Sequence, residues 1–337
     1  MKPTDFAYHL SNYFSKHLPG EVGAGKNTVL SYRDTFRLLL EFAKREGIKE
    51  ARLTFGCIDK SLIIKFLSWI ENERNCSTST RNQRLAAIHA FFSYMQSELP
   101  DLMFKFQEIL VIPMKKTQQK TIEFMSDEGI KAFLAQPSTR TKRGRKHLVL
   151  LSFLFATGCR VQELCDVRVA DALCNGSTVS RLTGKGGKSR YVPLDTAFVN
   201  LLQQYLEEFG LTKESRSSDY LFTNHSRCKY TWQGITFIVK KYGSLARSQH
   251  PTLIPEKMSS HTLRHSRAVS LLRSGVELIY IRDILGHVSV QTTEIYARID
   301  SEMKRKALEK ASGNLTNENM PAWQRDKTLM DWLKSLG

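Results

Sequence analysis

The sequence predicts a mainly α-helical protein with a small β-sheet, folded as two domains. Its 337 residues exceed the size at which one hydrophobic core keeps growing, so two domains are the natural expectation. Apolar residues recur at three- and four-residue steps through the first third of the chain, which is typical of a bundle of helices. Further along, two short runs flank a glycine-rich turn, the pattern of a β-hairpin among helices.

Residues 1–112 are expected to form an all-helical domain. The apolar periodicity predicts helices over Phe6–Leu18, Thr28–Ala43, Ile58–Ile70 and Thr80–Met95. The last of these opens with a polar cap and a basic first turn, where Arg81 and Arg84 oppose the helix dipole. These two arginines either meet an anion outside the protein or belong to a solvated helix face, as charge runs usually do.

A polar and basic segment, residues 113–120, holds little that could pack and is predicted to link the domains. The second domain, residues 121–312, is expected to mix helices with the hairpin. Ser126 caps its first helix, and a long apolar helix ends at Gly158, a residue suited to a helix C-terminus. Hairpin strands are predicted at residues 178–182 and 189–193, and further helices near residues 195–209, 231–247, 261–273, 277–285 and 301–311.

Residues 313–337 form a C-terminal tail that is predicted to contain an amphipathic helix. Beyond the helix breaker Pro321, apolar residues fall at helical spacing: Leu329, Met330, Trp332, Leu333 and Leu336. An apolar stripe of this kind needs a partner surface, either on its own domain or on another molecule.

The charge balance favours a polyanionic partner. Fifty Lys and Arg against 33 Asp and Glu give a formal net charge of +17, which indicates nucleic acid first and an anionic membrane surface second. The sequence has no apolar run of about 18 residues and no leader of the secretory kind, so a cytoplasmic protein is expected. The six cysteines show no zinc spacing and no nucleotide-binding loop is present, so neither metal nor cofactor is expected.

The second domain carries basic and imidazole groups, together with one tyrosine, that suit a reaction at phosphorus. They are Arg160, Lys185, His261, Arg264, His287 and Tyr296. Each alone is a weak signal, because glycine-flanked lysines and pairs at three-residue spacing are common. Together they provide arginine donors for phosphate oxygens, cations that favour a phenolate whose ordinary pKa is about 10, and a lysine that can protonate the leaving oxygen.

Other residues compete for these roles. Tyr280 lies in an apolar helical stretch and Tyr191 in a strand, so both are expected to pack in the core, which leaves Tyr296 as the preferred nucleophile. His265 follows Arg264 and is expected to be a buried, hydrogen-bonded residue rather than a catalyst.

The hairpin carries two further basic residues. Lys188 and Arg190 lie on its return strand and are the chief rivals of Lys185. Both are expected to contact a nucleic-acid backbone or to face solvent. With a DNA partner, four residues are therefore candidate backbone contacts: Arg81, Arg84, Lys188 and Arg190.

The motifs around these groups resemble those of the tyrosine recombinase (phage integrase) family. They read Thr-Gly-Cys-Arg-Val-Gln-Glu-Leu, Gly-Lys-Gly-Gly-Lys-Ser-Arg-Tyr-Val-Pro-Leu, His-Thr-Leu-Arg-His-Ser, and Leu-Gly-His with a tyrosine nine residues later. Order, context and spacing match over roughly residues 125–312. The helical domain, residues 1–112, resembles the family's core-binding (SAM-like) domain through less specific motifs.

This resemblance implies DNA strand breakage and rejoining without metal or ATP, by a clamp whose two domains grip opposite faces of the duplex. Tyr296 would attack the scissile phosphate and form a 3′-phosphotyrosine. Arg160 and Arg264 would hold the non-bridging oxygens, and Lys185 would protonate the leaving 5′ oxygen.

Three more positions take their roles from the same resemblance. His261 is implied as the proton acceptor from the tyrosine or as a further phosphate contact. His287 occupies a position that hydrogen-bonds the phosphate. Glu163 matches an acidic position that braces the site, although an ordinary helix residue is the competing interpretation.

The resemblance also implies a specific recombination site on double-stranded DNA. Four protomers would exchange strands on two duplexes through a Holliday junction. Other recombinases of the same element are possible partners. The tail would dock on a neighbouring protomer. When bound to DNA the protein would be associated with the nucleoid. The segment around and after Tyr296 resembles recombinases of transposons and integrative elements more than the Xer type that resolves chromosome dimers. A type IB topoisomerase and a catalytically silent DNA-binding factor are the remaining alternatives.

Overall fold

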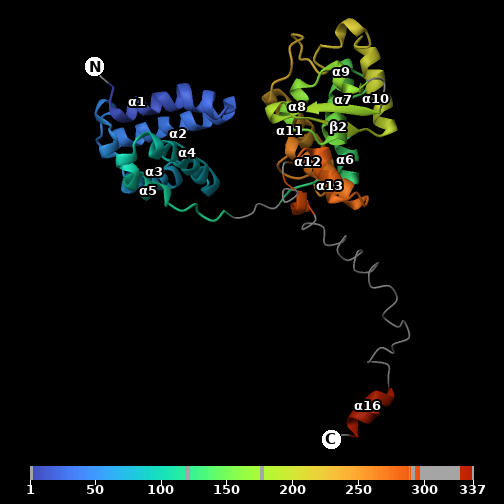
Figure 1. Ribbon diagram of the computed structural model, residues 1–337. Coiled ribbons are helices and arrows are strands. Elements are labelled where there is room, and N and C mark those ends of the chain that lie inside the picture. Colours follow the sequence, from blue (N-terminus) through green and yellow to red (C-terminus); the bar gives the residue numbers. More distant parts are fainter. Residues whose placement is uncertain are drawn as a thin grey trace. The chain divides into compact units, whose positions relative to one another are not determined.

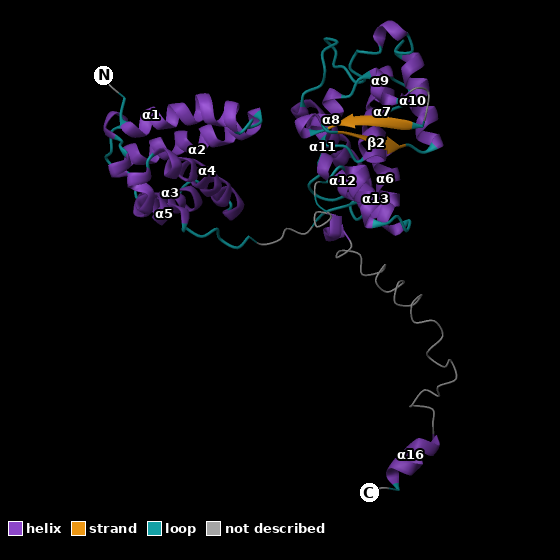
Figure 2. Ribbon diagram, in the orientation of Figure 1, coloured by secondary structure: helices purple, strands orange, loops and turns teal. Residues whose placement is uncertain are grey.

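The computed structural model describes residues 3–117, 122–174, 178–287, 289, 293–296 and 327–335. The chain divides between residues 120 and 121 into two compact units (Figure 1). In the described parts helices predominate, and a two-stranded sheet accompanies them (Figure 2). The predicted fold class, mainly α with a small sheet and two domains, is therefore confirmed.

The first unit is a bundle of helices. Its elements are α1 (Asp5–Asn12), η1 (Tyr13–Glu21), α2 (Lys26–Arg45), η2 (Glu50–Arg52), η3 (Phe55–Cys57), α3 (Lys60–Asn72), α4 (Thr78–Glu98), η4 (Pro100–Leu102) and α5 (Met103–Leu110). Phe91 is fully buried, and the rings of Phe6, Tyr13 and Phe36 meet it edge-on at centroid distances of 5.8, 5.1 and 5.0 Å. The four predicted helices are present, and α5 is an addition that the sequence did not predict.

The second unit carries the hairpin. Its elements are α6 (Asp127–Leu134), α7 (Lys142–Thr157), α8 (Val161–Asp166), α9 (Val169–Ala172), β1 (Val179–Thr183), η6 (Lys185–Gly187), β2 (Ser189–Pro193), α10 (Thr196–Glu208), η7 (Glu214–Arg216), α11 (Trp232–Gln249), α12 (Ser260–Arg273) and α13 (Leu278–Leu285). Helix α7 is buried along most of its length, and α6, α10 and α12 pack against it. The predicted helix near residues 301–311 lies outside the described residues.

The hairpin places Lys185 at its turn. Strands β1 and β2 are antiparallel, with Val179 opposite Pro193 and Thr183 opposite Ser189. Gly186 and Gly187 in the turn have φ of 76° and 74°, a left-handed conformation that side chains disfavour. The glycine-rich turn is therefore a backbone requirement, and the strands agree with the predicted ones.

The C-terminal segment contains a described helix, α16 (Lys327–Lys334). Trp332 and Leu333 on it are 56% and 49% exposed. Docking of this helix stays a prediction. None of the helices in the described parts of the chain has the length and apolar character needed to cross a membrane.

A buried histidine in α7 makes the stability of the fold depend on pH. His147 is 2% exposed, and its Nδ1 lies 3.0 Å from the hydroxyl of Tyr242. Burial, and then the charges of Arg143 and Lys146, lower the pKa of His147 to about 4. Since the unfolded chain then binds this proton more tightly than the folded one, stability falls as pH drops from about 6.5 toward 4.

At neutral pH, we expect His147 to contribute up to about 3 kcal/mol to the free energy of unfolding. This contribution is lost as the pH falls through the acidic range. Urea unfolding of the whole chain at about pH 7 and about pH 4.5 checks the prediction. The variant His147→Gln should be less stable at the higher pH and should show a smaller change between the two. An unchanged difference would contradict the assignment.

Candidate active site

The junction between α7 and α8 positions the first arginine of the site. Helix α7 ends at Gly158, whose φ is 58° and where a Cβ would lie 2.5 Å from Leu285 Cδ2. The chain then turns so that Arg160 is the N-cap of α8. Its Nη1 donates to Glu163 Oε1 at 2.9 Å and its Nη2 to the carbonyl of Gly286 at 3.0 Å. Arg160 is thereby fixed toward the end of α13.

A second arginine comes from the middle of α12. Arg264 is 3% exposed, and its Nη1 donates to the carbonyl of Gly158 at 2.7 Å. Its Nη2 is buried and has no hydrogen-bond partner among the residues that the structure describes. Burial, and then the charge of Arg160, lower its pKa to about 10, so it remains a cation at neutral pH. A buried cationic donor without a partner is costly, which indicates an anion-binding position.

Tyr296 lies near Arg264, and its ring is buried. It is 1% exposed and packs in a small apolar cluster that includes Ile281 and Leu285. Its hydroxyl lies 2.8 Å from Nδ1 of His265. Burial raises the pKa of Tyr296, and the charge of Arg264 opposes that increase.

Three histidines surround the tyrosine and the arginines. The rings of His261 and His265 stack at a centroid distance of 6.2 Å, and the ring of His287 stacks on Tyr296 at 6.4 Å. His287 Nδ1 lies 2.9 Å from the hydroxyl of Thr293. Burial, followed by neighbouring charges, lowers the pKa of His265 and of His287 to about 4. Both rings are therefore neutral at pH 7 in the free protein.

Five of the predicted catalytic groups thus gather in one place. Partial burial, and then the charges of Arg264 and Arg160, lower the pKa of His261, and the same arginines act on His287. Lys185 follows β1 in the hairpin turn, but its side chain lies outside the described part of the structure. The group that contacts the tyrosine hydroxyl is His265, which the sequence argument had set aside.

A spacing in the sequence could have revealed His265. It follows His261 by four residues on α12, and residues four apart on a helix share a face. The prediction of a hydrogen-bonded histidine is confirmed, but the side chain is only partly buried and its partner is the hydroxyl of the candidate nucleophile.

For Arg190, facing solvent was wrong, whereas its contact with DNA stays a prediction. Its side chain is 13% exposed and forms an ion pair with Glu163, whose own side chain is 3% exposed. The guanidinium reaches both carboxylate oxygens, at 3.0 and 2.7 Å. Glu163 therefore holds two arginines and is not an ordinary helix residue.

The expectation for the rival tyrosines was also wrong. Tyr191 is 63% and Tyr280 is 60% exposed, so neither packs in the core. Tyr296 is preferred because of its neighbours and not because its rivals are buried.

The candidate DNA contacts differ in exposure. Arg81 is 6% exposed, and its Nη1 donates to the carbonyl of Pro113 at 3.0 Å, so a solvated face is wrong for this residue. Arg84 Nη1 donates to the carbonyl of Ser31 at 3.0 Å. Lys188 is exposed. Contact of these three residues with DNA stays a prediction.

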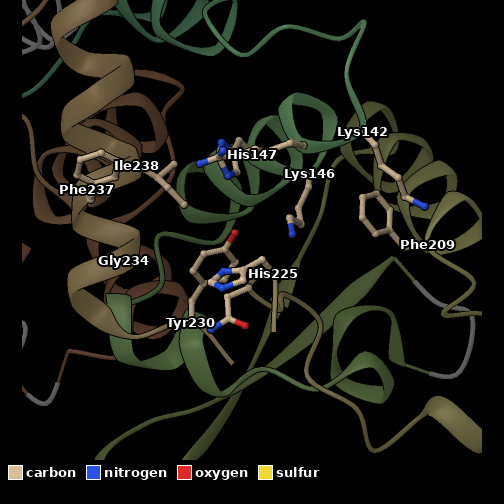
Figure 3. A pocket seen from close by; sticks show the side chains of 11 residues that line it. Lys142, Lys146, His147, Phe209, His225, Tyr230, Gly234, Phe237 and Ile238 are labelled. Carbon is tan, nitrogen blue, oxygen red and sulfur yellow. The ribbon is translucent and has the colours of Figure 1, made fainter. Parts of the chain in front are cut away.

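The cavity shown in Figure 3 is separate from this site. It has a volume of about 510 Å³, and α7 and α11 contribute much of its lining, including Lys146, His147 and Gly234. None of the described catalytic candidates lines it. The candidate catalytic groups that the structure describes therefore lie around Arg264 and not in this pocket.

The fold and the site define an enzyme that cleaves and rejoins DNA. Residues 123–303 match the model of the phage integrase family, and residues 12–98 match that of the phage integrase N-terminal SAM-like domain. The chain belongs to the phage integrase family, the tyrosine recombinases.

Similar proteins agree with this assignment. The chain is 33% identical over 336 residues to the putative integrase/recombinase y4rC of Sinorhizobium fredii, with 99% of each chain covered. It is 30% identical over 308 residues to the tyrosine recombinase XerD of Rickettsia prowazekii, covering 88% of this chain and 94% of the other. The chain also resembles a solved structure of the XerH site-specific recombinase bound to palindromic difH substrate, a post-cleavage complex. The two chains are 25% identical and superimpose with a TM-score of 0.68, and the match covers 86% of this chain and 80% of the XerH chain.

Proposed function

We propose that the protein integrates, excises or transposes a mobile element by site-specific recombination of DNA. The observation that carries the chemistry is the Tyr296 hydroxyl near buried Arg264, whose Nη2 has no hydrogen-bond partner among the described residues. The mobile-element role is supported by the similarity to a putative integrase/recombinase over 99% of both chains.

In the proposed reaction the Tyr296 hydroxyl oxygen attacks the scissile phosphorus. The bond from phosphorus to the 5′ oxygen breaks, and a 3′-phosphotyrosine forms. Arg160 and Arg264 bind the non-bridging oxygens, whose charge becomes more demanding as five oxygens crowd the phosphorus. Lys185 delivers the proton that the leaving 5′ oxygen needs.

The proton of the tyrosine passes to a histidine. His265 is the group in contact with the hydroxyl, so we assign it the role of proton acceptor. His261 keeps its alternative role, a further contact to the phosphate. Burial, and then the charges of His261 and Arg264, lower the pKa of His265. A bound phosphate opposes those charges and raises the pKa, so the imidazole becomes a better proton acceptor when substrate is present.

A plasmid assay tests the proposed function. Two copies of the DNA that borders the gene, placed in direct repeat, should recombine and delete the segment between them. Two copies of an unrelated sequence should not. Relaxation of supercoiled plasmids without a site would indicate a topoisomerase instead.

Resolution of chromosome dimers is the second candidate, because the chain is 30% identical to a XerD protein. The same assay with sites from the host chromosome's terminus region tests it. Recombination at those sites, and not at the borders of the gene, would replace the mobile-element role.

Assembly on DNA is proposed to involve four protomers, two duplexes and, in some complexes, other recombinases of the same element. Deleting residues 313–337 should then weaken assembly while sparing cleavage at a single site. The reason is that an exposed apolar stripe with Trp332 and Leu333 is worth several kcal/mol when it docks on a neighbour. Gel shifts should require at least about tenfold more protein for the higher complexes. Equal loss of assembly and of single-site cleavage would contradict docking between protomers.

A further inference from the structure

One largely buried arginine, Arg190, joins three elements of the site, and in the described part of the structure it forms no hydrogen bond with a candidate reacting group. It lies on β2, opposite Leu182 of β1. Its Nε donates to the carbonyl of Ile284 at the end of α13, at 2.8 Å. Its two terminal nitrogens donate to the two carboxylate oxygens of Glu163 on α8. The hairpin strand is thereby tied to α8 and α13 through a single guanidinium.

Glu163 lies between two arginines. Its Oε1 accepts from Nη1 of Arg160 at 2.9 Å and from Nη1 of Arg190 at 3.0 Å. Burial alone would raise the pKa of Glu163, but the hydrogen bonds and charges of Arg190 and then Arg160 lower it below its ordinary value. The carboxylate is therefore ionised and shared, so that Arg160 is not its sole counter-ion.

The same guanidinium supports the backbone before His287. A Cβ on Gly286, whose φ is 67°, would lie 2.9 Å from Nη1 of Arg190. The Gly286 carbonyl accepts from Nη2 of Arg160. Arg190 therefore contacts, directly or through Glu163, the groups that orient Arg160 and the residue that precedes His287.

We propose that Arg190 is a positioning residue for DNA cleavage, which shares Glu163 with Arg160 and thereby weakens the hold of that carboxylate on Arg160, so that Arg160 can also bind the scissile phosphate. Without Arg190, Arg160 is left as the remaining arginine partner of a buried carboxylate. That carboxylate competes with the phosphate for the Arg160 guanidinium. The inference rests on the proposed strand-cleavage function.

The first test compares Arg190→Gln with the wild-type protein on nicked DNA that carries the border of the gene. The rate of covalent adduct formation should fall roughly 10- to 100-fold, the size expected for a small misplacement of a reacting group. Binding in gel shifts should change less than about twofold. Arg181→Gln is the matched control, because Arg181 on the same hairpin pairs with Asp171 and is 48% exposed, and it should cleave at the wild-type rate.

The second test separates positioning from simple loss of folding. The double variant Arg190→Gln with Glu163→Gln removes the competing carboxylate, so it should cleave faster than Arg190→Gln alone. The single variant should also gain a pH dependence in mildly acidic solution, because its Glu163 loses the partner that keeps its pKa low. Arg190→Lys keeps the charge but not the paired geometry, so its cleavage rate should lie between those of the wild-type protein and Arg190→Gln.

The outcomes distinguish this inference from the proposed function. If the wild-type protein forms an adduct and Arg190→Gln forms it at the same rate, the inference is overturned and the function stands. If the double variant is slower than the single one and has the same pH profile, Arg190 is only structural. Absence of an adduct with wild-type protein on any border DNA overturns both the function and the inference.

Discussion

The variant Tyr296→Phe should form no covalent adduct with DNA while still binding it. The change removes the nucleophilic oxygen and keeps the ring, which fills an apolar cluster between α12 and α13. One hydrogen bond to His265 is lost, which costs about 1 kcal/mol and leaves the domain folded. The cleavage rate should therefore drop by more than about 10⁴-fold, as it does when a nucleophile is removed from a catalytic group.

The measurement follows from the polarity of the proposed reaction. A 3′-phosphotyrosine retains the upstream DNA segment, so a label at the 5′ end of the cleaved strand stays with the protein on a denaturing gel. Gel shifts with the same DNA should show unchanged affinity. Tyr280→Phe is the matched control, because Tyr280 is 60% exposed and the variant should form the adduct normally. A persistent adduct in Tyr296→Phe would reassign the nucleophile.

Much of the fold could be predicted because its signals are local. Apolar periodicity marks a helix wherever one face is buried, so α12 was predicted at residues 261–273 and is observed at Ser260–Arg273. Glycines at positive φ mark the turn of the hairpin and the end of α7. Helix α5 was missed because only Phe106 and Ile109 of its eight residues are buried, which leaves little periodicity to detect.

The partners of charged residues could not be predicted in the same way. Arg190 and Glu163 are 27 residues apart, and Arg81 and Pro113 are 32 apart. A basic residue in a polar stretch is expected to be exposed, and only the tertiary fold brings a carboxylate or a carbonyl to it. Arg190 was for this reason assigned to DNA or solvent.

The two rival tyrosines show a different limit. Tyr191 lies next to Val192 on β2, and neighbouring residues of a strand point to opposite faces. Val192 is buried and Tyr191 exposed, so alternation would have predicted the result better than apolar surroundings did. On helix α13, Ile281 lies on the buried face, whereas its neighbour Tyr280 is exposed.

The variant Arg264→Lys should reduce the rate of adduct formation by about 100- to 1000-fold, the loss expected when one donor to a developing oxyanion is removed. The guanidinium has two tasks that its shape allows at once. Nη1 holds the Gly158 carbonyl while Nη2 remains free for an anion. An ammonium is a single compact charge, so it cannot keep both positions in the same geometry. It would also lose its proton more readily beside Arg160 in a buried site.

A second arginine of α12 provides the control. Arg267 is partly buried, its Nε also has no hydrogen-bond partner in the described structure, and its guanidinium lies 5.6 Å from the ring of Phe155. Arg267→Lys should lower the free energy of unfolding by an amount comparable to Arg264→Lys, since both changes disturb the packing of the same helix. It should leave single-turnover cleavage unchanged. If both variants lose cleavage in proportion to stability, Arg264 serves to anchor the Gly158 turn and the phosphate is bound elsewhere.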